Sequence, residues 1–192
     1  MIQRFLLSLV FVAVASSAFA QGVTVEGVKF EPSVTVGGQT LALNGAGLRT
    51  RLFIKVYAAG LYAPQKASDP AALLKQDGPR RIQIGMLRDV DGQTFAGSLL
   101  EGLTANHSEQ QMAQFKVQID QLLAAMKSVG EAKKGDLITL DFASDAGTRM
   151  SINGRPLGEP IGGGAPFFNA LLRIWLGEKP ADASLKKAML GG

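Results

Sequence analysis

The chain has 192 residues, with 20 basic and 16 acidic side chains, a net charge of +4, one histidine and no cysteine. The lack of cysteine excludes disulfides, thiolate metal sites and a cysteine nucleophile. The basic residues are spread along the chain instead of forming one patch, so we expect no nucleic-acid partner, no metal site and no cofactor.

The first 20 residues are typical of a secretory signal peptide. Arg4 precedes an apolar run from Phe5 to Val14, and Ala18-Phe19-Ala20 fits the small-residue rule for cleavage. The run is too short to span a bilayer, although an uncleaved anchor is the alternative, and no later segment is long and apolar enough to span one. We therefore expect a periplasmic protein in which residues 21–192 form a single domain, and we expect a monomer.

The first half of this domain alternates between apolar and polar residues, a pattern that predicts strands. The expected strands cover residues 23–36 (as one or two strands), 41–48, 52–62 and 80–87. Ser68-Asp69-Pro70 interrupts them and should begin a short helix, since a proline after a capping residue is a common helix start.

The middle of the chain changes to helical spacing. Apolar residues three and four apart predict helices over residues 91–103 and 108–129, and Ser108 with Gln111 forms the glutamine version of a capping box. A hairpin over 136–142 and 148–152, the turn Asn153-Gly154 and a strand over 155–161 follow. Helices over 166–176 and 182–190 end the chain.

Strands joined mainly by turns, with the helices grouped together, predict an α+β fold. The simplest arrangement is one large antiparallel sheet with a helical layer on one face.

Four segments in this order give the chain a resemblance to the chalcone isomerases. They are Gly45-Ala46-Gly47-Leu48-Arg49, the run from Val56 to Tyr62, Asp91-Gly92-Gln93-Thr94-Phe95, and Ile174-Trp175-Leu176-Gly177. The resemblance covers residues 23–190 and implies the fold of that family, an open-faced β-sandwich with a helical layer on one side. Secreted bacterial proteins of this kind are more similar to the chain than the plant enzymes are.

The resemblance also shows which catalytic groups of the plant enzymes this chain lacks. Arg49 matches the arginine that binds the anionic oxygen of the substrate, and Tyr57 stands where those enzymes have a threonine. Their catalytic tyrosine falls on Phe95, their asparagine on Gly102, and a further polar residue at about Phe168. The enzymes need donors at the developing enolate oxygen, so we expect no catalytic residues here.

What remains is an arginine beside an apolar cavity, which resembles the non-catalytic relatives that bind fatty acids. An arginine fork donates two parallel hydrogen bonds to a carboxylate. We expect a ligand site for a fatty acid or a similar amphipathic carboxylate, made by Arg49, Tyr57, Phe95, Phe168 and Asn169. Asn169 is included as a polar residue of the cavity wall.

Two alternatives remain open from the sequence. The first is an isomerase, an intramolecular lyase that acts on a chalcone-like enone. The second is an envelope protein that binds a partner and has no small ligand.

Overall fold

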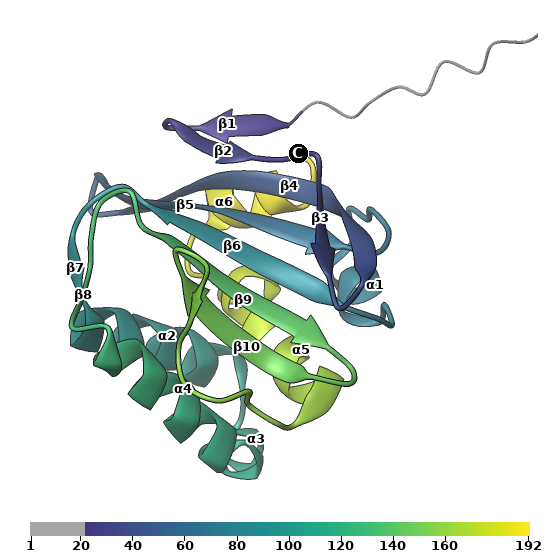
Figure 1. Ribbon diagram of the computed structural model, residues 1–192, viewed down its shortest axis with the longest axis vertical. Coiled ribbons are helices and arrows are strands. Elements are labelled where there is room, and N and C mark those ends of the chain that lie inside the picture. Colours follow the sequence, from purple (N-terminus) through teal and green to yellow (C-terminus); the bar gives the residue numbers. More distant parts are fainter. Residues whose placement is uncertain (1–21) are drawn as a thin grey trace, which may run out of the picture.

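A seven-stranded antiparallel sheet forms the centre of the molecule (Figure 1). The computed structural model describes residues 22–192, so the expected signal peptide lies outside the described residues. The sheet order is β11-β10-β9-β6-β5-β4-β3. Its strands are β3 (Ser33–Val36), β4 (Gln39–Arg51), β5 (Ile54–Ala63), β6 (Arg80–Met86), β9 (Leu137–Ala143), β10 (Gly147–Ile152) and β11 (Arg155–Pro156).

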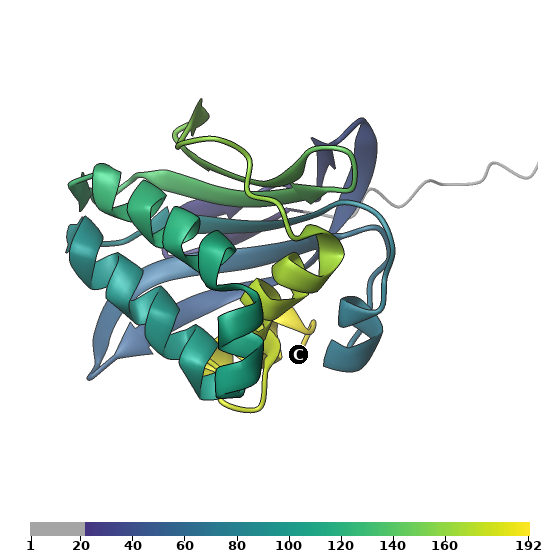
Figure 2. The same ribbon diagram turned by 90° about the horizontal axis from the view of Figure 1, so that it is seen from below.

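One face of this sheet is covered by helices (Figure 2). They are α1 (Pro70–Leu74), α2 (Gly92–Asn106), α3 (Glu109–Gln114), α4 (Lys116–Ser128), α5 (Gly164–Leu176) and α6 (Ala183–Met189). Helix α5 is the innermost, because Phe167, Phe168 and Trp175 are all almost completely buried. The α+β fold and the one-sided helical layer expected from the sequence are confirmed. Within residues 22–192, no helix combines the length and hydrophobicity needed to cross a bilayer.

A short hairpin, β1 (Val23–Val25) and β2 (Val28–Phe30), lies on the side of the sheet away from the helices (Figure 1). It is fixed there by Phe30, which is fully buried. The ring packs over Gly60 of β5, where an added Cβ would lie 2.7 Å from the Phe30 ring. Glycine is needed at this position because any side chain would push the hairpin off the sheet.

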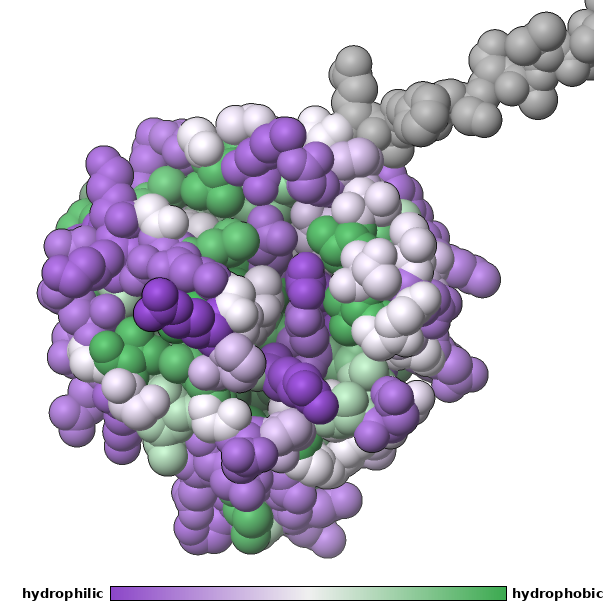
Figure 3. Space-filling model, viewed as in Figure 1, coloured by the Kyte–Doolittle hydropathy of each residue, from purple (hydrophilic) through white to green (hydrophobic). Residues whose placement is uncertain are grey.

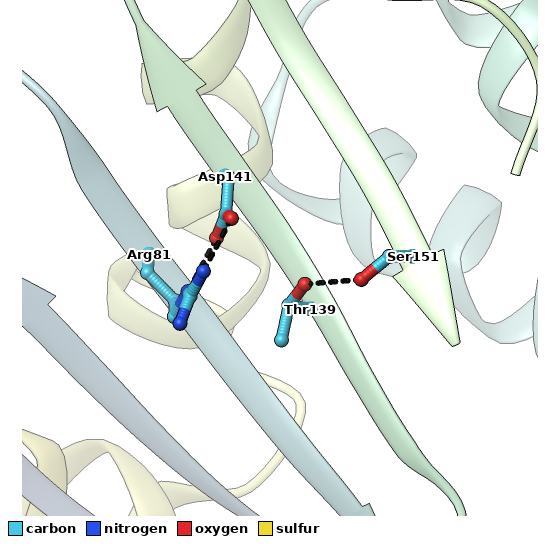
Figure 4. A network of polar contacts seen from close by, with 4 residues as sticks. All are labelled: Arg81, Thr139, Asp141 and Ser151. Carbon is cyan, nitrogen blue, oxygen red and sulfur yellow. Dashed lines mark hydrogen bonds and ion pairs between the residues drawn. The ribbon is translucent and has the colours of Figure 1, made fainter. Parts of the chain in front are cut away.

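The part of this face that β6, β9 and β10 form is polar, with Arg81, Asp141, Thr139 and Ser151 on it. Figure 3 shows hydrophilic side chains across the middle of it, and Figure 4 shows the contacts that link its strands. Arg81 of β6 donates two hydrogen bonds of 2.5 Å to the Asp141 carboxylate of β9, and Thr139 bonds to Ser151 at 2.7 Å. These bonds raise the pKa of Arg81. The bidentate Arg81–Asp141 pair therefore links β6 to β9 on a face that no helix covers.

The long amphipathic stretch from Ser108 is divided into two helices, where the sequence predicted one. Phe115 leaves the helical conformation with φ −104° and ψ 16°, so α3 ends and α4 begins on either side of it. The capping box is present as predicted, because Ser108 and Gln111 each accept a hydrogen bond from the other's backbone amide. Two short strands, β7 (Val90–Asp91) and β8 (Glu131–Ala132), were not predicted; they pair with each other beside the start of α2.

The two-residue turns between paired strands place glycine second in every case but one. Three two-residue turns, Glu26-Gly27, Gly37-Gly38 and Asn153-Gly154, have positive φ at both residues and glycine in second place. The β4–β5 turn has the same positive φ values, 49° and 67°, at Leu52 and Phe53. The sequence had placed Leu52 at the start of a strand. Each non-glycine residue held in this conformation costs on the order of 1–3 kcal/mol.

Substitution of Phe30 tests how strongly the first hairpin stabilises the fold. Phe30→Ala should lower the free energy of unfolding by about 3–5 kcal/mol, because it removes a fully buried ring and leaves a cavity over Gly60. Phe53→Ala is the matched control, since Phe53 is 99% exposed and its loss should change stability by about 0.5 kcal/mol or less. Chemical denaturation measures both. Equal effects of the two substitutions would show that the β1–β2 hairpin does not contribute to the stability of the fold.

Candidate functional site

Arg49 and Tyr57 lie directly opposite each other on β4 and β5, as the alternation of the two strands predicted. Both side chains project toward the helical layer. The guanidinium carbon of Arg49 lies 5.3 Å from the centroid of the Tyr57 ring, within the range of a cation–π interaction. The aromatic ring therefore provides the surface on which the arginine rests.

The Tyr57 ring is itself held by two helices. Phe95 of α2 meets it edge to face, with ring centroids 6.2 Å apart and an interplanar angle of 75°. The indole Nε1 of Trp175, on α5, donates a hydrogen bond of 2.9 Å to the Tyr57 hydroxyl. Burial raises the pKa of the Tyr57 phenol, and the nearby Arg49 charge and the Trp175 bond oppose this only in part. The hydroxyl is therefore protonated at neutral pH.

Arg49 carries an uncompensated charge. Its side chain is half-buried, and its Nε is fully buried without a hydrogen-bond partner. Among residues 22–192 no acidic group forms an ion pair with it. Asp182 lies close enough to influence Tyr57, but its carboxylate accepts hydrogen bonds from the backbone amides of Thr50 and Leu185. A half-buried guanidinium with an unpaired Nε and no acidic partner among the described residues favours an anionic ligand.

A cavity of about 360 Å³ opens beside Arg49, between the end of the β4–β5 hairpin and the start of α2. Its walls contain three arginines, two aspartates and a larger set of apolar and small polar side chains. The lining residues are Arg49, Arg51, Leu52, Ile54, Val56, Arg88, Asp89, Val90, Asp91, Thr94, Phe95 and Ser98.

The two aspartates of the cavity are already engaged by the backbone. Asp89 accepts a 2.7 Å hydrogen bond from the amide of Lys134, and Asp91 caps α2 by accepting a 2.9 Å bond from the amide of Thr94. Neither forms an ion pair with a lining arginine among the described residues. The cavity therefore presents arginine donors beside an apolar wall, the chemistry of a carboxylate receptor.

The structure brings together three of the five site residues predicted from the sequence. Arg49 and Phe95 line the cavity, and Tyr57 lies beneath Arg49 with its hydroxyl turned to Trp175. Direct contact of Tyr57 with a ligand stays a prediction.

Phe168 and Asn169 lie elsewhere, around a second buried arginine. Phe168 stacks on Phe142 with centroids 5.5 Å apart, and the Arg80 guanidinium lies near both rings. Asn169 accepts a 2.6 Å hydrogen bond from Arg80 and donates one of 2.9 Å to the carbonyl of Leu74. The space between the sheet and α5 is filled here by packed side chains, so neither residue is among those that line the cavity.

Two arginines that line the cavity were not among the site residues predicted from the sequence. Arg51 is exposed and also lines the cavity, because its separation of two from Arg49 places both on one strand face. Arg88 follows β6 and reaches the cavity because β6 is the strand next to β5 in the sheet. No local pattern marks Arg88, since its role depends on which strands are neighbours.

Two of the positions that the resemblance matches to oxyanion donors in chalcone isomerases have no donor here. Phe95 has no hydroxyl, and Gly102 packs tightly against Ile174 of α5. A Cβ at Gly102 would lie 2.8 Å from the Ile174 side chain, so Ile174 occupies the space where a longer residue would project. The part of the chain that the structure describes also contains no cluster of three or more histidine or acidic side chains suited to a metal ion.

Comparison with known proteins agrees with this fold. A family model described as chalcone isomerase-like matches residues 22–191, so the chain belongs to the chalcone isomerase-like family. Among solved structures, it is similar to a fatty-acid binding protein of Arabidopsis thaliana, with a TM-score of 0.66 and 18% sequence identity. That match covers 88% of this chain and 95% of the other. No curated protein matches it in sequence.

The environment of the two tyrosines in the chain can be tested by alkaline titration. Burial raises the pKa of Tyr57, and it raises that of Tyr62 to about 12. Neither should form phenolate in the native protein at the usual pKa of about 10, whereas both should in denaturant. Their contribution to stability is complete below about pH 10 and is lost as the pH rises toward 12.

Phenolate absorbance in the near ultraviolet measures this titration. Ionisation of both tyrosines at about pH 10 in the native state would contradict the closed packing of Tyr57 against Phe95 and Trp175.

Proposed function

We propose that this protein is a periplasmic, non-catalytic binding protein for a fatty acid or a similar amphipathic carboxylate. The observation that carries the proposal is the half-buried Arg49 guanidinium, which faces a cavity with an apolar wall and has no acidic partner within residues 22–192. A carboxylate would supply the missing charge and accept two hydrogen bonds from the fork.

The cavity suggests how such a ligand would lie. Its carboxylate would bind Arg49, with Arg51 or Arg88 as a second cation, and its chain would run along Val56 and Phe95. The volume of about 360 Å³ is at the small end of the range for ligand pockets, which favours a medium-length chain. Each buried methylene would contribute about 0.8 kcal/mol.

In this arrangement Tyr57 positions the arginine. Its ring supports the guanidinium, and its protonated hydroxyl, bonded to Trp175, fixes the ring angle. Should a carboxylate reach deeper than the cavity, the phenolic proton would be the second donor.

Two findings that are independent of the site geometry support the proposal. The structurally similar Arabidopsis thaliana protein is described as fatty-acid binding. The periplasmic location rests on the sequence of the first 20 residues, with Arg4, the apolar run and the Ala18-Phe19-Ala20 site.

An isomerase is the alternative, and the missing donors weigh against it. Loss of one oxyanion donor typically costs about 2.7–4 kcal/mol, and here both Phe95 and Gly102 lack one. Without these two donors an anion receptor can still hold a ligand, but it stabilises an enolate less.

The first test of the proposal is dodecanoate binding measured by isothermal titration calorimetry. Arg49→Leu should weaken binding roughly tenfold to a hundredfold, because a hydrogen bond to a charged group contributes about 1.5–3 kcal/mol. Dodecanol, which has a hydroxyl in place of the carboxylate, should lose a similar factor with the wild type. Arg155→Leu removes an exposed arginine outside the cavity and should leave the affinity unchanged. Equal affinity of Arg49→Leu and the wild type for dodecanoate would contradict the proposal.

The second test addresses catalysis. A chalcone added to the protein should lose its visible absorbance no faster than in buffer, because two oxyanion donors are missing. Faster loss that Arg49→Ala abolishes would establish the isomerase instead.

A further inference from the structure

The tip of the β4–β5 hairpin exposes three consecutive apolar side chains. Leu52 is 83% exposed, Phe53 99% and Ile54 48%. In Figure 2 this hairpin, in blue, runs out to a free tip at one corner of the molecule. Other large exposed apolar residues of the described chain, such as Leu100 and Val117, stand singly. A contiguous apolar projection on a secreted domain indicates an interaction site.

The turn that holds this tip is unfavourable for its residues. The other two-residue turns of the described chain that have the same positive φ pair all place glycine second, including Asn153-Gly154. Leu52 and Phe53 adopt that conformation without glycine and without burying either side chain. Neither backbone preference nor packing within the described chain explains Leu52 and Phe53 at this turn.

Three cations lie on the cavity side of the tip, together with Asp89 and Asp91, whose carboxylates accept backbone hydrogen bonds. Arg51 immediately precedes it, and Arg88 lies across the same cavity. Lys134 is exposed and is placed beside them by its amide bond to Asp89. None of the three cations forms an ion pair among the described residues, whereas Lys55 is paired to Glu26 at 2.8 Å.

We propose that this hairpin docks the protein on a lipid bilayer that contains anionic phospholipids. Leu52 and Phe53 insert at the boundary between headgroups and acyl chains, while Arg51, Arg88 and Lys134 bind headgroup phosphates. The apolar tip is complementary to the acyl chains of such a surface, and the cations beside it, unpaired within the described chain, are complementary to its anionic headgroups. Leu52 and Ile54 also line the cavity, so docking brings its opening to the membrane.

Docking shares Arg51 and Arg88 with the ligand site proposed around Arg49, but Phe53 is absent from the cavity wall and projects from the domain. The two proposals are therefore tested with different probes, vesicles for docking and dodecanoate for the ligand. A protein partner and a second copy of this chain are the other occupants of an apolar tip. The experiment below distinguishes them from a bilayer.

Vesicle co-sedimentation is the main test. The purified protein should bind vesicles of phosphatidylcholine with an equal part of phosphatidylglycerol at least about tenfold more strongly than vesicles of phosphatidylcholine alone, and less strongly at high salt. Arg51→Gln with Arg88→Gln should reduce binding to the anionic vesicles by about tenfold. Dodecanoate affinity of Arg49→Leu is measured separately, so failure of one proposal leaves the other standing.

The double variant Leu52→Asn with Phe53→Gly separates docking from folding. It copies the chain's own Asn153-Gly154 turn, so it should raise the melting temperature while it removes vesicle binding. Val117→Ser is the matched control, since it removes a 65% exposed apolar residue at the other end of the helical layer, beside α3. This control should bind vesicles as the wild type does.

Phe53→Trp reports insertion directly. The native Trp175 is buried, so a blue shift of tryptophan emission on addition of anionic vesicles would come from residue 53. Absence of binding to anionic vesicles, or binding that the double variant retains, would overturn the proposal. So would a blue shift without vesicles that follows protein concentration together with a dimer mass in light scattering, which would identify a second copy as the occupant.

Discussion

The structure of the site depends on one interaction, the packing of the Arg49 guanidinium on the Tyr57 ring. Tyr57 is fixed by Trp175 from α5 and by Phe95 from α2, so two helices and two strands meet at this one phenol. The aromatic support stabilises the arginine but does not neutralise it. The charge remains available to an anion that enters the neighbouring cavity.

The cavity and the hairpin tip form one continuous feature. The strands that carry Arg49 and Tyr57 continue into the turn at Leu52 and Phe53, and both Arg51 and Leu52 belong to the cavity wall. A receptor for an amphipathic carboxylate whose rim binds a bilayer would take up its ligand without releasing it into water. The deeper interior is filled, since Phe168 stacks with Phe142 and Ile174 closes the space at Gly102.

The sequence predicted the fold well because its signals are local. Alternation and helical spacing identified most strands and helices, and the pairing of Arg49 with Tyr57 followed from two adjacent strands. The site was predicted only in part. Arg88 lines the cavity because β6 is the neighbour of β5 in the sheet, and sequence alone does not give that order. Phe168 lies outside the cavity because it stacks on Phe142, a residue distant in sequence. The Leu52-Phe53 turn was missed because neither residue has turn propensity, and that mismatch marks the tip as unusual.

The central claim is that Arg49 holds a carboxylate, and a crystal structure of the dodecanoate complex tests it most directly. The account predicts a carboxylate within hydrogen-bonding distance of the Arg49 guanidinium, with the alkyl chain against Phe95 and Val56. A chain bound elsewhere, or Arg49 turned to pair with Asp182 while the cavity is occupied, would contradict it.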